Sequence, residues 1–290
     1  MELDKRPSLL NCAYVAIATA TILGLAAGMA FAAEPAKPAT EEHADTALAK
    51  AAQNPIADMI SLPFQFNANL NTGPQKKTQD VLNIQPVIPV HLNSDWNLIT
   101  RTIVPLISQP QLTPGDDRTN GIGDIQFSAF LSSAKPSDWV LGAGMIVQAP
   151  SATDTVLGQG KWGLGPTAVA LHVERGDPWV YGMLINNVTS VGGQSGRANV
   201  NQMLFEPFFN YNVPGHPGLY LTSAPEFTAN WNSTKSSNRW TVPLGGGIGQ
   251  IMRWGEQAVN LQASAYYNVD KPEFGSNWNL RLQVQFLFPK

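Results

Sequence analysis

The last stretch of the chain, residues 278–288 (WNLRLQVQFLF), alternates between apolar and polar side chains. Successive side chains of an extended strand point to opposite faces, so this stretch has one apolar face and one polar face. A tilted strand needs about 9–11 residues to cross a bilayer and carries aromatic side chains at the interfaces, a role that Trp278 and Phe288 can fill. The pattern predicts a membrane strand with lipid on one side and water on the other.

Composition separates this interpretation from a secreted β-sandwich, which also uses alternating strands. Only 13% of the 290 residues are charged, whereas soluble domains have about 25%. A sandwich of this size needs a charged outer surface, so the composition favours the membrane. The net charge of −3 also argues against nucleic acid as a partner.

The N-terminus has the features of a secretory signal. Lys5 and Arg6 precede an apolar run, residues 13–30, which ends in an Ala-Phe-Ala cleavage pattern. We predict a signal peptide over residues 1–32, which contains the only cysteine, Cys12. No later apolar run is long enough for a spanning helix, and an exported chain that enters a membrane with strands must close into a barrel.

Two further segments follow the signal peptide. Residues 33–56 are rich in Ala, Glu and Pro and predict a flexible or partly helical periplasmic arm, with a helix over 41–52 and too little chain for a plug domain. Residues 57–290 predict an all-β, closed antiparallel transmembrane β-barrel of about twelve strands, an even number as in bacterial single-chain barrels. The expected strands are 58–70, 80–92, 95–108, 121–133, 138–149, 162–174, 178–190, 199–212, 218–231, 239–252, 257–269 and 277–288.

Aromatic residues and loops support the barrel, whereas prolines oppose it. All eight tryptophans fall near predicted strand ends, as in an interfacial belt. The polar, glycine-rich segments 109–120, 153–161 and 192–198 predict extracellular loops. Prolines inside a closed sheet predict bulges or kinks, because each lacks a backbone donor. These are Pro63, Pro86, Pro89, Pro105, Pro166, Pro207, Pro225 and Pro243.

The sequence contains no recognisable catalytic, cofactor or metal motif. His91 and His172 predict lone polar residues of the barrel, and His216 a turn residue. The run Gly245–Gly249 lacks the Lys-Ser/Thr of a phosphate loop, so it predicts a place where a strand bends or packs closely. We therefore expect no enzyme activity, no cofactor and no metal.

Charged and aromatic residues in the polar phases of the strands predict the lining of the lumen. A charge facing lipid at the bilayer midplane costs about 2–4 kcal/mol, so these side chains should point inward. They either pair across the lumen and stiffen the wall or form a constriction that sorts solutes. The predicted lumen-lining residues are Arg101, Asp124, Glu206, Glu226, Arg239, Arg281, Tyr220 and Tyr266, with Phe208 in the same phase.

Several motifs resemble a bacterial outer-membrane family named for the meta-pathway of phenol degradation. They are LNIQPVIP (82–89), WNLITR (96–101), GIGDIQ (121–126), GKWGLGP (160–166), RWTVPLGGG (239–247) and the terminal QFLFPK (285–290). Members of this family are often labelled "transporter" or mislabelled after neuromedin U. The resemblance spans roughly residues 54–290 and implies an outer-membrane β-barrel that takes up small compounds, aromatic ones included. It carries over no binding residues.

The expected function is an outer-membrane channel for passive uptake or efflux of small solutes, aromatic or hydrophobic ones among them. The expected partners are outer-membrane lipid and lipopolysaccharide, the barrel-assembly machinery and a small-molecule solute. Phe288, followed by Pro289 and Lys290, is the candidate assembly signal. The alternatives are a lipase-like barrel enzyme, which requires a serine or an acid beside His91 or His172 in the lumen or on the outer rim, and a soluble secreted β-sandwich that binds a ligand.

Overall fold

The computed structural model describes residues 39–289, with side chains from Thr46 onward, so the predicted signal peptide lies outside the described residues. The helical elements are α2 (Ala39–Ala52) and the short 3-10 helix η1 (Ser236–Asn238). The strands are β1 (Ile60–Thr72), β2 (Lys77–Ile84), β3 (Val87–His91), β4 (Trp96–Gln109), β5 (Thr119–Ile122), β6 (Ile125–Ser133), β7 (Trp139–Ala149), β8 (Lys161–Val173), β9 (Trp179–Gly193), β10 (Asn201–Asn212), β11 (Leu219–Ser223), β12 (Phe227–Asn230), β13 (Trp240–Trp254), β14 (Gln257–Asp270) and β15 (Trp278–Phe288).

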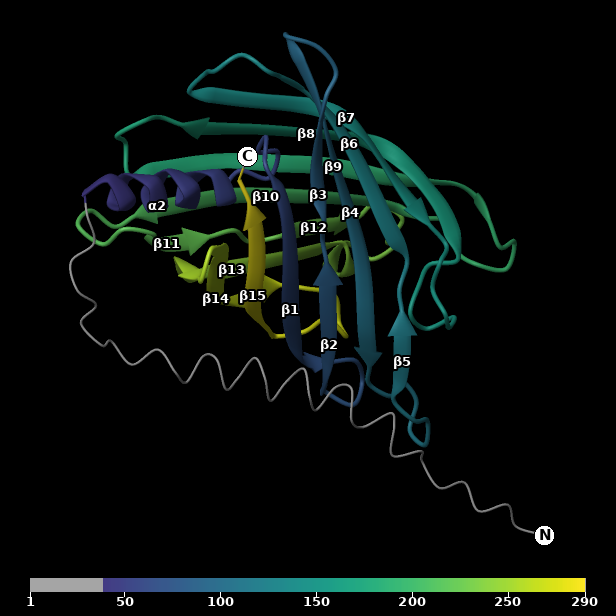
Figure 1. The fold of residues 1–290 in the computed structure, drawn as a ribbon. Coiled ribbons are helices and arrows are strands. Elements are labelled where there is room, and N and C mark those ends of the chain that lie inside the picture. Colours follow the sequence, from purple (N-terminus) through teal and green to yellow (C-terminus); the bar gives the residue numbers. More distant parts are fainter. Residues whose placement is uncertain (1–38, 290) are drawn as a thin grey trace. The chain divides into compact units, whose positions relative to one another are not determined.

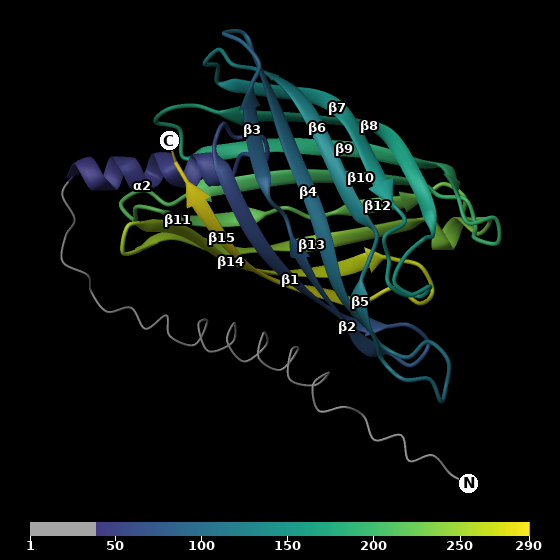
Figure 2. The same cartoon turned by 45° about the vertical axis from the view of Figure 1, so that its right-hand side comes forward.

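The fifteen strands form one closed antiparallel barrel with twelve positions (Figures 1 and 2). Three positions consist of two collinear segments each: β2 with β3, β5 with β6, and β11 with β12. The barrel closes where β1 pairs with β15, in a register from Ile60↔Phe288 to Leu70↔Trp278. The predicted fold class is confirmed, and each expected strand agrees with one barrel position to within three residues at either end.

Prolines explain two of the three interruptions. Pro86 lies between β2 and β3, and Pro225 lies between β11 and β12. A third proline, Pro243, lies at a register shift between β13 and β14. These three positions confirm the predicted kinks and bulges, whereas the other five in-strand prolines lie within continuous strands. The remaining interruption is Gly123-Asp124, where the backbone N–H of Gly123 donates to the carbonyl of Pro105 at 2.8 Å.

The outer wall of the barrel is apolar over most of its height. On β15, Leu280 is 41% exposed on the outside, whereas its neighbour Arg281 is 7% exposed inside. The same phase runs through the other strands and leaves large side chains exposed, among them Leu141, Met145, Met183, Phe209, Leu244 and Ile248. Such a continuous apolar band matches the hydrocarbon core of a membrane.

The tryptophans form two belts, one at each end of the barrel. Trp96, Trp139, Trp179 and Trp254 lie at one end, and Trp162, Trp231, Trp240 and Trp278 lie at the other. Most of these rings have an aromatic neighbour, such as Tyr211 beside Trp179 at 4.8 Å between centroids. Tryptophan prefers the membrane–water interface, so the two belts mark the edges of the apolar band.

The two ends of the barrel differ in the length of their connections. Short turns, residues 92–95, 134–138, 174–178, 213–218 and 255–256, lie at the end that holds Ile60 and Phe288. The opposite end carries the longer loops 110–118, 150–160, 194–200, 231–239 and 271–277, together with the tight turn 73–76. The three predicted extracellular loops all fall at this second end. Because barrels of this kind have short periplasmic turns, we name the two ends periplasmic and extracellular.

Helix α2 lies at the periplasmic end, beside the C-terminal end of β15 (Figures 1 and 2). It matches the helix predicted over residues 41–52. No helix within residues 39–289 is both long enough and apolar enough to cross a membrane.

Replacing Leu282 with Arg should impair assembly, because Leu282 lies near the middle of β15 on its outer face. A charge at that depth costs about 2–4 kcal/mol. The measurement is the gel-mobility difference between unboiled and boiled protein from the membrane fraction. The matched control is Gln283→Arg, one position along on the lumen face. If Leu282→Arg assembles as well as this control, the outward assignment of Leu282 is wrong.

Candidate solute-binding cavity in the barrel lumen

A cavity of about 140 Å³ lies inside the barrel between β1, β4, β10, β11, β14 and β15. It has room for several water molecules or one small solute. Its lining is rich in amide side chains: Gln53, Asn54, Gln65, Gln85, Asn210, Asn260, Gln262, Gln283 and Gln285. An amide group both donates and accepts hydrogen bonds, so this lining suits a polar solute or water.

The amides of adjacent strands are joined by hydrogen bonds. Gln85 donates to Gln65 at 2.9 Å, and Asn260 donates to Gln285 at 3.0 Å. Gln65 reaches Asn67 through a longer contact of 3.4 Å. These contacts hold the amides in fixed orientations around the cavity.

Arg281 and Glu226 form an ion pair on one side of the lumen. The Arg281 Nη2 donates to Glu226 Oε1 at 2.5 Å, and the same guanidinium donates to Asn67 and to the carbonyl of Ala224, both at 3.2 Å. The Arg281 side chain is only 8% exposed, whereas that of Glu226 is 40% exposed. Three partners, one of them a counter-ion, therefore stabilise the buried guanidinium.

Arg101 and Glu206 are two further charged residues predicted to face the lumen, and both line the cavity. Arg101 lies on β4 and Glu206 on β10, which stand on opposite sides of the closed sheet. Arg101 makes one hydrogen bond among the described residues, from Nη2 to Gln85 Oε1 at 2.5 Å. Glu206 makes no hydrogen bond and no ion pair among them.

Tyr220 and Tyr266 point inward, but their rings are almost completely covered, each being 1% exposed. The Tyr220 hydroxyl donates to Asn260 Oδ1 at 2.8 Å, and the Tyr266 hydroxyl accepts from the backbone N–H of Ala224 at 3.1 Å. A Cβ at Gly249 would lie 2.2 Å from the Tyr220 ring, so glycine is needed there for the ring to pack on β13. Close packing is what the run Gly245–Gly249 predicted.

Residues 46–57, which we call the plug segment, lie at the periplasmic side of the cavity. Leu48 and Ala49 of α2 are buried against the inward-facing Ile251, Ala258 and Leu287. Residues 52–55 then form part of the cavity lining. Residues 46–56 therefore differ from the flexible or partly helical periplasmic arm that was expected over residues 33–56, because they pack onto the inner wall of the barrel.

Ile56 anchors the end of the plug segment in an apolar cluster on the opposite part of the inner wall. The cluster contains Val87, Ile99, Phe130, Val169, Leu171, Val180, Leu184 and Phe208. On β7, a Cβ at Gly142 would lie 2.8 Å from Ile56 Cδ1, so this glycine leaves room for Ile56. Part of the lumen is thus an apolar core, in contrast to the water-filled lumen expected from the strand pattern.

Polar contacts fix the plug segment to the periplasmic turns. Lys50 Nζ donates to the carbonyls of Glu174 and Asp177, at 2.6 and 2.5 Å. Gln53 exchanges hydrogen bonds with Asn212 at the end of β10. The turn 174–178 is held in place by β8 and β9 on either side of it. The hydrogen bonds of Lys50 to this turn therefore fix the position of α2.

Two of the predicted lumen residues lie elsewhere. Asp124, at the break between β5 and β6, accepts hydrogen bonds from the backbone N–H groups of Ala152 and Gln159 and so anchors the extracellular loop 150–160. Arg197 of the next loop donates to the carbonyls of Gly158 and Gln159. Arg239 precedes β13 at the extracellular end, and its buried Nε has no hydrogen-bond partner among the described residues.

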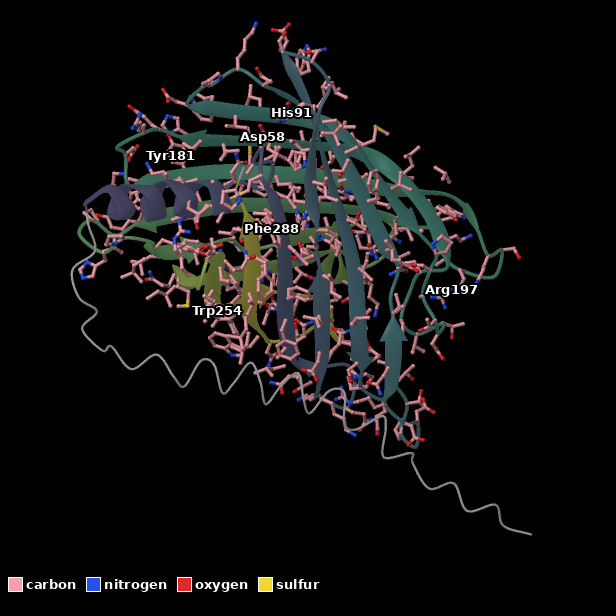
Figure 3. All side chains as sticks on the ribbon, in the orientation of Figure 1. Asp58, His91, Tyr181, Arg197, Trp254 and Phe288 are labelled. Carbon is pink, nitrogen blue, oxygen red and sulfur yellow. The ribbon has the colours of Figure 1, made fainter. Side chains whose placement is uncertain are left out.

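His172 and His91 lie outside the cavity. His172 faces outward in the periplasmic aromatic belt, stacked on Tyr181 at 5.1 Å and packed against Trp139 at 5.2 Å. His91 forms an ion pair with Asp58 at 2.8 Å between the chain before β1 and the end of β3 (Figure 3). This pair supplies the acid that the enzyme alternative requires, but it lies half-exposed at the rim, away from the cavity.

Within residues 39–289, no group of three or more His, Cys, Asp or Glu side chains is arranged to hold a metal ion.

The plug contacts and the amide lining were missed at the level of sequence. One signal was present: Leu287 is an apolar residue in the polar phase of the last strand, and Ile251 and Ala258 are similar exceptions. Neighbouring apolar exceptions of this kind indicate that something apolar covers the inner face. The amides Gln85, Asn260 and Gln285 were recognised as polar-phase residues but not as a site, because pairing across strands depends on register.

Comparison with solved structures shows that outer-membrane barrels have this fold. A crystal structure of an outer-membrane channel from Pseudomonas putida F1 matches with a TM-score of 0.57 and 16% identity, over 79% of this chain and 94% of that one. The NanC porin matches with a TM-score of 0.51 and 8% identity, over 80% and 100%. No protein-family model and no curated protein sequence matches the chain.

These identities show the fold alone. The closed twelve-position barrel, its apolar outer band and its two tryptophan belts make the protein an outer-membrane β-barrel, as the sequence predicted.

Replacing Glu226 with Ala should lower the free energy of unfolding by about 1–3 kcal/mol, because it removes the carboxylate that forms an ion pair with the buried Arg281. The measurement is the urea midpoint of the barrel reconstituted in lipid. The control is Glu256→Ala in the exposed turn 255–256, where a change within about 0.5 kcal/mol is expected. Equal midpoints for the two variants would show that the ion pair does not stabilise the wall.

Proposed function

We propose that this protein is a passive outer-membrane channel for small solutes, closed at its periplasmic mouth by the plug segment in the conformation described. The observation that carries this proposal is the polar cavity, enclosed by a lipid-facing barrel and bounded on the periplasmic side by residues 52–55. A barrel can be stable without a water-lined interior, so stability alone does not require a cavity surrounded by hydrogen-bonding groups. Such a cavity suits the passage or binding of a solute. The resemblance to the phenol meta-pathway family and the likeness to a channel and a porin support the same conclusion.

The lining favours a polar solute over the aromatic or hydrophobic solutes that the resemblance implies. The Tyr220 and Tyr266 rings are packed against the wall, and Phe208 is buried in the apolar cluster, so these rings offer little surface to a solute. The cavity is lined mostly by amides and charged groups, together with a few apolar residues such as Val87 and Leu184. An apolar solute there would leave buried polar groups without partners, at a cost of about 1–3 kcal/mol for each group.

The plug segment has to move for a solute to cross. It is attached to the barrel by a small apolar contact through Leu48 and Ala49, by Ile56, and by the polar contacts of Lys50 and Gln53. These contacts leave the strand pairings of the wall unchanged. Displacement of the plug segment therefore opens the lumen while the barrel stays intact.

Replacing Ala49 with Glu should increase single-channel conductance in planar bilayers severalfold. Ala49 is fully buried between α2 and the inner wall, so a carboxylate there forces the helix away. The matched control is Ala47→Glu, which lies on the exposed side of the same helix and should conduct as the unmodified protein does. Gel mobility of unboiled protein verifies that both variants are folded barrels.

Two results would contradict the proposal. If neither the unmodified protein nor folded Ala49→Glu conducts ions, the barrel is not a channel. If Ala49→Glu and Ala47→Glu conduct equally, the plug segment does not control the mouth.

A further inference from the structure

Two opposite charges face the cavity without neutralising each other. Arg101 on β4 has most of its guanidinium donors unused, since its one hydrogen bond goes to a neutral amide. Glu206 on β10 has no hydrogen bond or ion pair within the described part of the chain. The two groups form no ion pair with each other, although the charge of Arg101 acts on Glu206, and both side chains line the cavity.

A second charged pair, Arg281 with Glu226, lies near enough for both of its charges to act on Glu206. Arg281 also lines the cavity, but it makes its ion pair with Glu226 and donates further hydrogen bonds to Asn67 and the carbonyl of Ala224. The net charge of these four side chains is zero. What the cavity presents is therefore one positive end and one negative end, on opposite walls.

Between the two ends lie groups that can donate and accept hydrogen bonds. Gln65 and Gln85 line the side near Arg101, and Asn210 lies four residues from Glu206 on the same strand and the same face. The volume of about 140 Å³ limits the occupant to a few heavy atoms. The cavity thus matches a short molecule that carries both charges.

We propose that this cavity binds a small zwitterion, with the carboxylate of the solute on Arg101 and its ammonium group on Glu206. The inference rests on the proposed channel function and specifies its solute class as compact amino acids and related betaines. An arginine can bind a carboxylate through two parallel hydrogen bonds, which also orients the solute along the line between the walls.

Other classes of solute fit the two charges less well. A simple anion on Arg101 would face the Glu206 carboxylate, and a simple cation on Glu206 would face the Arg101 guanidinium. A neutral apolar molecule would displace water from both charged groups without offering them a hydrogen-bonding partner, which is costly for buried ions. Only a dipolar solute satisfies both walls at once.

The test uses β-alanine as the zwitterion, with propionate, propylammonium and propionamide as probes of similar size. Calorimetric titration of the detergent-solubilised barrel measures binding, and current through the reconstituted protein measures block. We expect saturable binding and block by β-alanine, and at least tenfold weaker effects of the other three compounds.

Variants separate the roles of the two charges. Arg101→Gln and Glu206→Gln should each weaken β-alanine binding at least tenfold. The matched controls Arg175→Gln and Glu256→Gln, in exposed periplasmic turns, should bind as the unmodified protein does. The double exchange Arg101→Glu with Glu206→Arg should recover binding, because a zwitterion can enter a reversed dipole in the opposite orientation.

Three results would overturn the proposal: no binding of β-alanine, equal binding of propionate and β-alanine, or no loss of binding in a folded Glu206→Gln barrel. The second result would make the cavity an anion site on Arg101. Failure of the channel function gives a different result. A barrel that binds β-alanine but never conducts has the binding site and is not a channel, whereas a barrel that conducts but does not bind β-alanine is a channel without this site.

Discussion

Backbone hydrogen bonding in a bilayer is the constraint on which this structure depends. Lipid offers no partner to a free N–H or C=O group, so a sheet in the membrane has to pair its first strand with its last. Here that closure is the β1–β15 ladder, eleven residue pairs long. Closure leaves the wall with an outer face on lipid and an inner face that must be filled with water, side chains or another segment of the chain.

The inner face is filled in two different ways. One part is an apolar core completed by Ile56 of the plug segment, where inward glycines such as Gly142 make room. The other part is a network of amides and charges around the cavity. The segment between the predicted signal and the first strand is thus part of the barrel interior, and it connects the stability of the inner wall to the closing of the periplasmic mouth.

The wall was predictable from local patterns, whereas the site was only partly so. Alternation and turn residues located all twelve barrel positions, because the faces of a strand have period two and lipid permits few exceptions. The inward phase of Arg101, Glu206 and Arg281 could be read in the same way. Their different contacts could not. Arg281 on β15 forms an ion pair with Glu226, which lies in the break between β11 and β12, whereas Glu206 makes no hydrogen bond or ion pair among the described residues. Asp124 shared the polar phase but lies at a break, where its carboxylate serves a loop.

The amino-acid sequence by itself determined the class of fold, the two faces of each strand, the ends of the barrel and the belts of tryptophan. Each of these follows from a property of one strand in contact with lipid or water. Only the tertiary structure decided what occupies the lumen: the docking of α2 and Ile56, the neutralisation of Arg281 and the separation of Arg101 from Glu206. These depend on strand register and on contacts between residues more than a hundred positions apart, such as Lys50 with the turn at Glu174 and Asp177, which no local pattern encodes.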